Sequence, residues 1–199
     1  MPSGSTHDRI TLWSAPIITV CAYLLFRNGG LTLLVLVGFL FSGLMFGPDL
    51  DIYSVQFKRW GLVRWIWVPY QKTMKHRSLF SHGFLLGTCG RLLYIGVIAF
   101  GVAVLAMAIA QIIGNFYWNW HQSFRTLAML LVGPYRGEAI ALFVGLESGA
   151  MSHTVSDVLG SYWKKRQRRR AKSVSARLGA KKNLTKKKPR GQGRSGRRP

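Results

Sequence analysis

Long apolar runs separated by short polar breaks dominate the first 160 or so residues of the chain. Residues 10–26 form an apolar run of 17 residues, residues 27–30 supply an Arg-Asn-Gly-Gly turn signal, and residues 31–46 form a second run of 16. A helix needs about 20 apolar residues to cross a hydrocarbon core of about 30 Å, so both runs lie near the short end of a membrane span. The pattern predicts a hairpin of two transmembrane helices.

Two further runs follow in the second half of the chain. Residues 92–113 form 22 consecutive residues without a charge, and a fourth run covers residues 139–159 after a shorter apolar piece at residues 127–132. The fourth run is interrupted by three ionisable residues, which are Glu147, His153 and Asp157. The expected fold class is therefore all-α, a polytopic membrane bundle of about four transmembrane helices.

The charge of the chain divides it into two parts. The formal net charge is +22, although only 17% of the residues are charged and 49% are hydrophobic. Residues 164–199 hold 17 of the 28 Lys and Arg residues and no acid. We therefore expect a membrane-embedded, metal-binding domain over residues 1–163 and a disordered polybasic tail over residues 164–199. The tail is expected to attract anionic lipid headgroups, or nucleic-acid phosphates, although no base-reading motif is present.

Basic residues also predict the orientation in the membrane. With four spans, the N-terminal segment, residues 47–83 and the tail lie on one side, and they contain nearly all of the Lys and Arg residues. The positive-inside rule places this side in the cytoplasm, together with both termini. Within the long loop, residues 57–75 mix basic residues with Trp60, Trp65, Trp67 and Tyr70, which predicts an interfacial connector in the headgroup zone.

The chain has only six acids and five histidines, and most of them lie at the ends of apolar runs. On the predicted topology these clusters meet the same face of the membrane. Ionisable groups beside a bilayer are costly and are by default functional, with a partner to be named. The partner we propose is a metal ion, and the candidate ligands are His7, Asp49, Asp51, His76, His82, His153 and Asp157.

Each cluster has a simpler explanation. Asp8, beside His7, is well placed to cap the first helix. Asp49 and Asp51 follow a helix C-terminus, where the dipole disfavours anions, so they require a cation that a loop Lys or Arg can also supply. His153 and Asp157 are four residues apart on one helical face, which suits either two metal ligands or a plain hydrogen bond.

The ridge that carries His153 and Asp157 continues backwards through Gly145 and Gly149. Small residues at this spacing let another helix approach closely, so the pair is expected to lie against a neighbouring span. Glu147 lies roughly 80° to 120° round the helix from this ridge. It is a candidate metal ligand, a candidate general acid or base, or a hydrogen-bond partner of the ligands. Alternatively, its charge faces a different water-filled cavity.

The succession Gly-Pro-Asp-Leu-Asp, His-Arg-x-x-x-Ser-His and Met-Ser-His-x-x-x-Asp resembles metal-binding integral membrane proteins of unknown function found chiefly in cyanobacteria. More distantly, it is similar to predicted membrane-bound metal-dependent hydrolases associated with the bacterial SOS regulon, and through them to zinc-dependent phospholipase C. The chain differs from the hydrolase pattern at Ile52, where that group often has a histidine. The resemblance implies a multi-pass protein of the bacterial inner (plasma) membrane or the thylakoid membrane, with a metal centre of His and Asp.

The function predicted from these residues is a metal-dependent hydrolase that acts on a phosphoester of a lipid or lipid-linked substrate at the cytoplasmic face. Imidazole and carboxylate ligands without thiolate suit zinc, with manganese and iron as alternatives. Arg77 is a candidate phosphate clamp, or an ordinary positive-inside arginine. The alternative functions are metal binding without catalysis and membrane tethering through the basic tail. The sequence assigns no catalytic residue and no oligomeric state.

Overall fold

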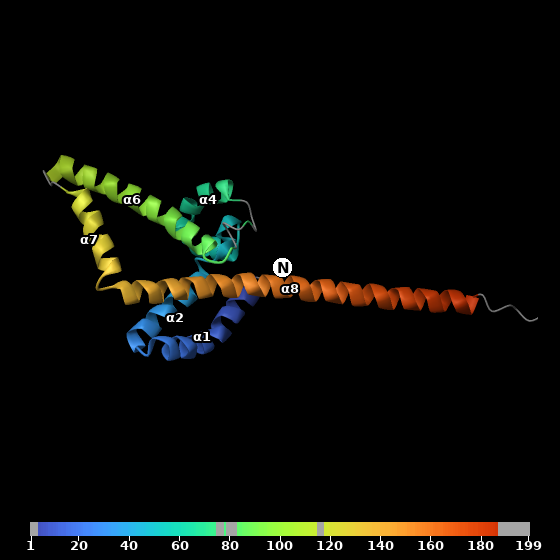
Figure 1. The fold of residues 1–199 in the computed structure, drawn as a ribbon. Coiled ribbons are helices and arrows are strands. Elements are labelled where there is room, and N and C mark those ends of the chain that lie inside the picture. The colour runs from blue at the N-terminus through green and yellow to red at the C-terminus, as the bar shows by residue number, and fades with distance from the viewer. Residues whose placement is uncertain (1–3, 75–77, 79–82, 115–117, 187–199) are drawn as a thin grey trace, which may run out of the picture. The chain divides into compact units, whose positions relative to one another are not determined.

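A computed structural model describes residues 4–74, 78, 83–114 and 118–186, and every regular element in these ranges is a helix (Figure 1). The prediction of an all-α fold is confirmed. The α-helices and 3₁₀ helices (η) are α1 (Gly4–Phe26), α2 (Gly29–Leu44), η1 (Pro48–Asp51), α3 (Val55–Arg59), η2 (Gly61–Trp67), α4 (Val68–Thr73), α6 (Leu86–Gly114), α7 (Trp120–Val132) and α8 (Arg136–Lys186).

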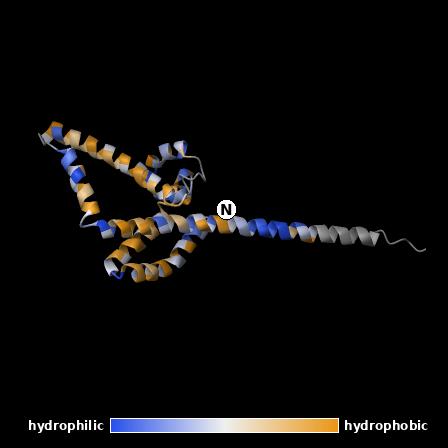
Figure 2. Ribbon diagram, in the orientation of Figure 1, coloured by the Kyte–Doolittle hydropathy of each residue, from blue (hydrophilic) through white to orange (hydrophobic). Residues whose placement is uncertain are grey.

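Three helical stretches are long and apolar enough to cross a membrane, namely Thr6–Phe26, Gly29–Asp51 and Leu86–Gly114. Figure 2 shows apolar residues along most of α1, α2 and α6. A fourth candidate is a bent pair, α7 with α8, whose axes differ by 80°. Gly133 and Pro134 occupy the break, and proline cannot continue the hydrogen-bond ladder of α7. The described residues therefore contain three candidate spans, or four if the bent pair forms one.

The turn expected between the first two runs joins α1 and α2, which pack side by side as a hairpin (Figure 1). Arg27 adopts a left-handed φ of 49°, which ends α1. Asn28 then caps α2, because its side chain accepts a hydrogen bond from the Leu31 amide at 3.1 Å. Two residues, Arg27 and Asn28, thus reverse the chain and return the end of α2 to the start of α1.

Glycines bring α2 and α8 into close contact. A Cβ added at Gly145 would collide with the carbonyl oxygen of Val35, and one at Gly149 would collide with that of Phe39. From the other side, a Cβ at Gly38 would lie 2.8 Å from the Leu142 carbonyl oxygen. The close approach predicted from the spacing of small residues is confirmed, and it is a backbone-to-backbone contact.

The loop between α2 and α6 folds into a small core. Its centre is Trp67 and Tyr70, both 0% exposed, packed with Phe46 and Leu50. Their rings meet edge to face, with centroids 5.7 Å apart and planes inclined by 87°. Both side chains therefore belong to the protein core of this loop, and the position of the loop in the headgroup zone stays a prediction. Trp65 remains 65% exposed.

The chain divides into two compact units, Met1–Asp157 and Val158–Pro199. In the second unit, α8 continues as far as Lys186. Composition predicted disorder from residue 164, whereas the described part of the tail is helical. Lys, Arg, Gln and Ala are good helix formers, and neither Pro nor Gly interrupts residues 161–178. The predicted domain boundary after residue 163 stays a prediction.

We predict that Gly149→Ala destabilises the protein. The added methyl group has no space against the α2 backbone, and overpacking of this kind costs about 1–3 kcal/mol. Thermal unfolding in detergent should show a lower midpoint. Gly101→Ala is the matched control, since nothing lies within 4 Å of a Cβ at Gly101, and it should be neutral or stabilising. Equal midpoints for the two variants would contradict the packing described here.

We also predict that both termini lie in the cytoplasm. This requires the bent pair of α7 and α8 to cross the membrane as one span, since three spans would leave the termini on opposite sides. Fusions of a fluorescent protein and of alkaline phosphatase to each end test this. The fluorescent fusions should be active at both ends and the phosphatase fusions inactive, whereas one active phosphatase fusion would indicate three spans.

Candidate metal centre

The first turns of α1 place His7 inside the first unit, where it is 6% exposed. The neighbouring Asp8 forms a two-pronged ion pair with Arg59 of α3, at 2.9 and 2.5 Å, and Arg59 also donates to the Leu44 carbonyl oxygen at 2.8 Å. The hydrogen bond to Asp8 raises the pKa of Arg59. One guanidinium therefore ties the start of α1 to the end of α2, and His7 is held with them.

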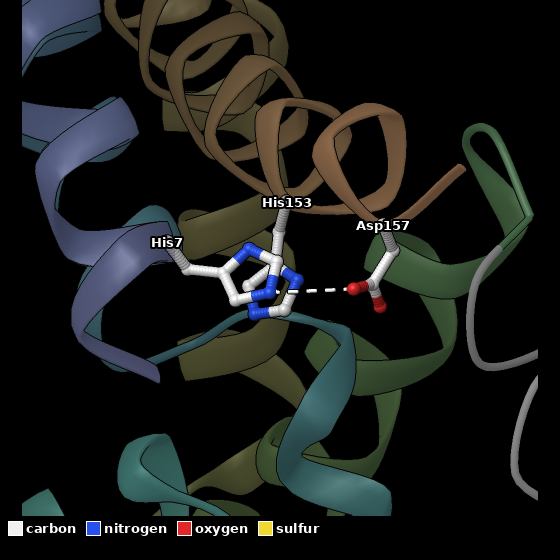
Figure 3. A group of neighbouring side chains, drawn as sticks. All are labelled: His7, His153 and Asp157. Atoms are coloured by element: carbon white, nitrogen blue, oxygen red, sulfur yellow. Dashed lines mark ion pairs between the residues drawn. The ribbon is translucent and has the colours of Figure 1, made fainter. Parts of the chain in front are cut away.

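His153 and Asp157 come from α8 and are 3% and 7% exposed. Their spacing of four residues puts both side chains on the face that α8 turns toward α1. Figure 3 shows the His7 ring lying against the His153 ring, with the Asp157 carboxylate beside them. The ridge of Gly145 and Gly149 explains this position, because it allows α8 to approach α2, which is itself packed on α1.

Each of His7, His153 and Asp157 offers one ligand atom within 4.8 Å of the other two. Nε2 of His7 lies 3.3 Å from Oδ1 of Asp157. Asp49 of η1 adds a carboxylate, whose Oδ2 lies 3.5 Å from Nε2 of His153. Donor atoms on one tetrahedral zinc lie about 3.3–3.6 Å apart, because zinc bonds to nitrogen and oxygen are about 2.0–2.2 Å long. The two separations of 3.3 and 3.5 Å fall in this range, and the donor types suit a divalent ion.

A serine orients the His7 ring. The Ser156 hydroxyl donates to the His153 carbonyl oxygen at 2.8 Å and lies 2.7 Å from Nδ1 of His7. A hydroxyl has one proton, so Ser156 accepts the hydrogen bond from Nδ1. The lone pair of a neutral His7 is then on Nε2, the nitrogen nearest Asp157. Outer hydrogen bonds of this kind fix the tautomer and orientation of metal-binding histidines.

The two imidazole rings are stacked, with centroids 3.8 Å apart and planes inclined by 8°. Both rings thus offer a nitrogen within 4.8 Å of an Asp157 carboxylate oxygen.

The two acids of the Gly-Pro-Asp-Leu-Asp segment have different surroundings. Asp49 is partly exposed at 19% and approaches His153, whereas Asp51 is 4% exposed and lies in electrostatic contact with Tyr70 and Arg91. In a 3₁₀ helix, side chains two residues apart point about 120° from each other. The turn therefore points the two carboxylates in different directions, and the one from Asp49 lies beside His153.

Glu147 lies outside the group of His7, His153 and Asp157. Its Oε1 accepts a hydrogen bond from the Leu85 amide at 3.0 Å, and Leu85 has a left-handed φ of 60° just before α6 begins. The side chain is 7% exposed. Glu147 thus holds the chain where it enters α6, and its predicted role beside the metal ligands stays a prediction.

The structure thus brings together three of the seven predicted ligands, His7, His153 and Asp157, and places Asp49 of η1 beside His153. Asp51 lies outside this group of three. The other two ligands, His76 and His82, and the candidate clamp Arg77 lie outside the described residues. The sequence did not predict the functions of Ser156, of Arg59, which holds the start of α1, or of Arg91, which is buried at the start of α6. Ser156 lies three residues after His153 on the same helix, but a serine at that spacing is too common to be a signal.

Comparison with protein families gives one match, to a family described as uncharacterized metal-binding protein (DUF2227), over residues 2–167. No curated protein and no solved structure matches the chain. The matched residues include every donor atom of the centre and the glycine ridge that places α8 against α2.

We predict that Ser156→Ala weakens metal binding by about 10- to 100-fold, the usual cost of removing an outer hydrogen bond to a histidine ligand. Isothermal titration of the purified protein with Zn²⁺ measures this. Ser148→Ala is the control, because its hydroxyl bonds the Val144 carbonyl inside α8, away from His7. Equal affinities in the two variants would mean that the serine does not orient the ring.

Proposed function

The chain belongs to the family of uncharacterized metal-binding proteins DUF2227, and on that premise we propose that it is an integral membrane, zinc-dependent phosphoester hydrolase. The observation that carries the proposal is the buried group of His7, His153 and Asp157, whose donor atoms converge within 4.8 Å. In this proposal these three residues hold the ion, and Asp49 is the fourth ligand or a neighbour of the ion.

The donor set supports zinc. Two imidazoles and one carboxylate, without thiolate, form a common set in catalytic zinc sites, which keep a further position for water or substrate. Manganese and iron accept the same donors and are the alternatives. When bound, an ion of this type supplies a Lewis acid for a phosphoryl oxygen and makes water a stronger nucleophile at neutral pH.

The chain's own residues perform the remaining tasks. Ser156 holds the His7 ring so that Nε2 faces Asp157, and Arg59 holds Asp8 beside it. The burial of His7, His153 and Asp157 separates them from bulk water, which strengthens their electrostatic interactions. Asp49 is the more exposed of the two acids in the turn. In this proposal a substrate approaches the ion from the side on which Asp49 lies.

A phosphoester at the cytoplasmic face is the proposed substrate class. Three apolar helices compatible with membrane spans support a position at the bilayer, and the positive-inside rule supports the cytoplasmic side. A lipid or lipid-linked phosphate would reach such a site from the headgroup layer. The basic residues from Lys164 onward would favour anionic lipid.

Metal binding without catalysis is the second candidate, and the position of Asp49 favours it. If Oδ2 of Asp49 is a ligand together with His7, His153 and Asp157, four protein donors complete a tetrahedron. Zinc sites with four protein ligands are structural, whereas three ligands leave a position for substrate. The function of Asp49 therefore separates the two candidates.

We predict that the purified wild-type protein carries about one zinc ion per chain and that His153→Ala and Asp157→Ala lose it. Elemental analysis measures the metal, and a panel of soluble, lipid and lipid-linked phosphoesters measures turnover. His121→Ala is the matched control, because His121 lies exposed on α7 away from the centre, and it should retain both properties.

The outcomes distinguish the two functions. Turnover that is lost with His153 and restored by added Zn²⁺ in the stripped wild type supports the hydrolase. Stoichiometric zinc with no turnover on any substrate supports metal binding alone, and Asp49→Ala should then weaken the affinity strongly. Wild-type protein without metal after purification and after zinc loading would overturn both.

A further inference from the structure

A second group of buried charges lies at the start of α6. The buried residues of this helix are Gly87, Thr88 and Arg91, which share one face at its N-terminal end. Arg91 is 1% exposed, although apolar neighbours such as Leu93 and Val97 are 71% and 63% exposed. In this part of α6 the guanidinium is buried in the protein and these aliphatic side chains are exposed. The arginine therefore holds the N-terminal end of α6 against the rest of the first unit.

Several elements meet at this guanidinium. Nη2 of Arg91 donates to the Thr88 hydroxyl oxygen at 3.0 Å, and the guanidinium carbon lies 5.7 Å from the centroid of the Phe46 ring. The charge of Arg91 also interacts with Tyr70 of α4, Glu147 of α8 and Asp51 of η1. Leu50 and Leu146, the neighbours of these two acids in the chain, belong to the same core as Phe46, and Leu92 of α6 packs against it. The environment of the Arg91 guanidinium thus combines an aromatic ring with the charges of two carboxylates.

Burial makes these charges depend on one another. A guanidinium removed from water is strongly unfavourable unless it is paired and hydrogen-bonded, and the same holds for Asp51 and Glu147. Arginine is suited to such a position, because its planar fork carries five donors and can reach two acids at once. Loss of Arg91 would leave two buried carboxylates without this counter-charge.

Both acids lie on elements that carry candidate metal ligands. Asp51 is two residues after Asp49 in η1, and Glu147 is six residues before His153 in α8. Glu147 also holds the Leu85 amide, where the chain enters α6. A guanidinium between Asp51 and Glu147 therefore joins the turn of Asp49 to the helix of His153.

We propose that Arg91 is the positioning residue of the metal centre, whose buried guanidinium holds η1 against α8 through Asp51 and Glu147 and so keeps Asp49 beside His153. The inference rests on the proposed function, since it concerns the same ion. Arg91 does not bind the phosphate of a substrate. This distinction rests on its burial, since Arg91 is 1% exposed and its charge interacts with those of Asp51 and Glu147.

The test uses Co²⁺ as a spectroscopic substitute for zinc in the full-length protein in detergent. The absorption of bound Co²⁺ depends on the number and type of its ligands, which a loss of stability alone does not change. We predict that Arg91→Met binds Co²⁺ about 10- to 100-fold more weakly and with an altered spectrum. Arg91→Lys, which keeps the charge without the fork, should lie between Arg91→Met and the wild type. Arg125→Met is the control, because Arg125 is exposed on α7.

The possible results separate this inference from the proposed function. Wild-type affinity and spectrum in Arg91→Met would overturn the positioning role and leave metal binding intact. A wild-type protein that binds no Co²⁺ would overturn both. If Arg91→Met does not fold, judged by circular dichroism and size exclusion, Arg91→Lys decides in the same way. Failure of both variants to fold would assign Arg91 to the fold as a whole and overturn a role specific to the centre.

Discussion

The burial of ionisable side chains among apolar helices is the constraint on which the first unit depends. His7, His153 and Asp157 are less than a tenth exposed, in a chain with only six acids and five histidines. Charges in such surroundings persist only when partners with opposite charge or suitable hydrogen bonds face them. The structure meets this condition with a convergent set of His and Asp donors, which fits a metal ion, and with a guanidinium at the start of α6.

Helix packing brings these partners together. The close backbone contact of α2 with α8 at Gly145 and Gly149 positions the ridge that ends in His153 and Asp157. Side chains at those glycines would separate the helices by the width of at least one methyl group, and the donor atoms would separate with them. Arg59 fixes the start of α1, which carries His7, because it binds Asp8 and the last turn of α2 at the same time. The glycines thus let the helices approach closely, and the long side chain of Arg59 holds their ends together.

The two arginines have related tasks in different surroundings. Arg59 lies at the surface and holds an acid adjacent to one ligand, so solvent screens much of its attraction. Arg91 is buried and contacts an acid two residues from another ligand, so its charge acts at a lower dielectric. Tyr70 contacts the same buried charges, and burial raises the pKa of its hydroxyl. The hydroxyl of Tyr70 is therefore neutral at physiological pH.

The sequence by itself determined the helical class, the apolar runs and the residues rich in metal-binding chemistry. These properties follow from period, composition and spacing along one chain, as with the pair at positions 153 and 157. The tertiary structure alone decided that Asp49 and Asp51 face different partners, and that Trp67 and Tyr70 form a core. The tertiary structure also placed Ser156 beside the His7 ring and buried Arg91 at the start of α6. The reason is physical: which side chain becomes a partner depends on the distance between helices, and no local pattern encodes a distance across the fold.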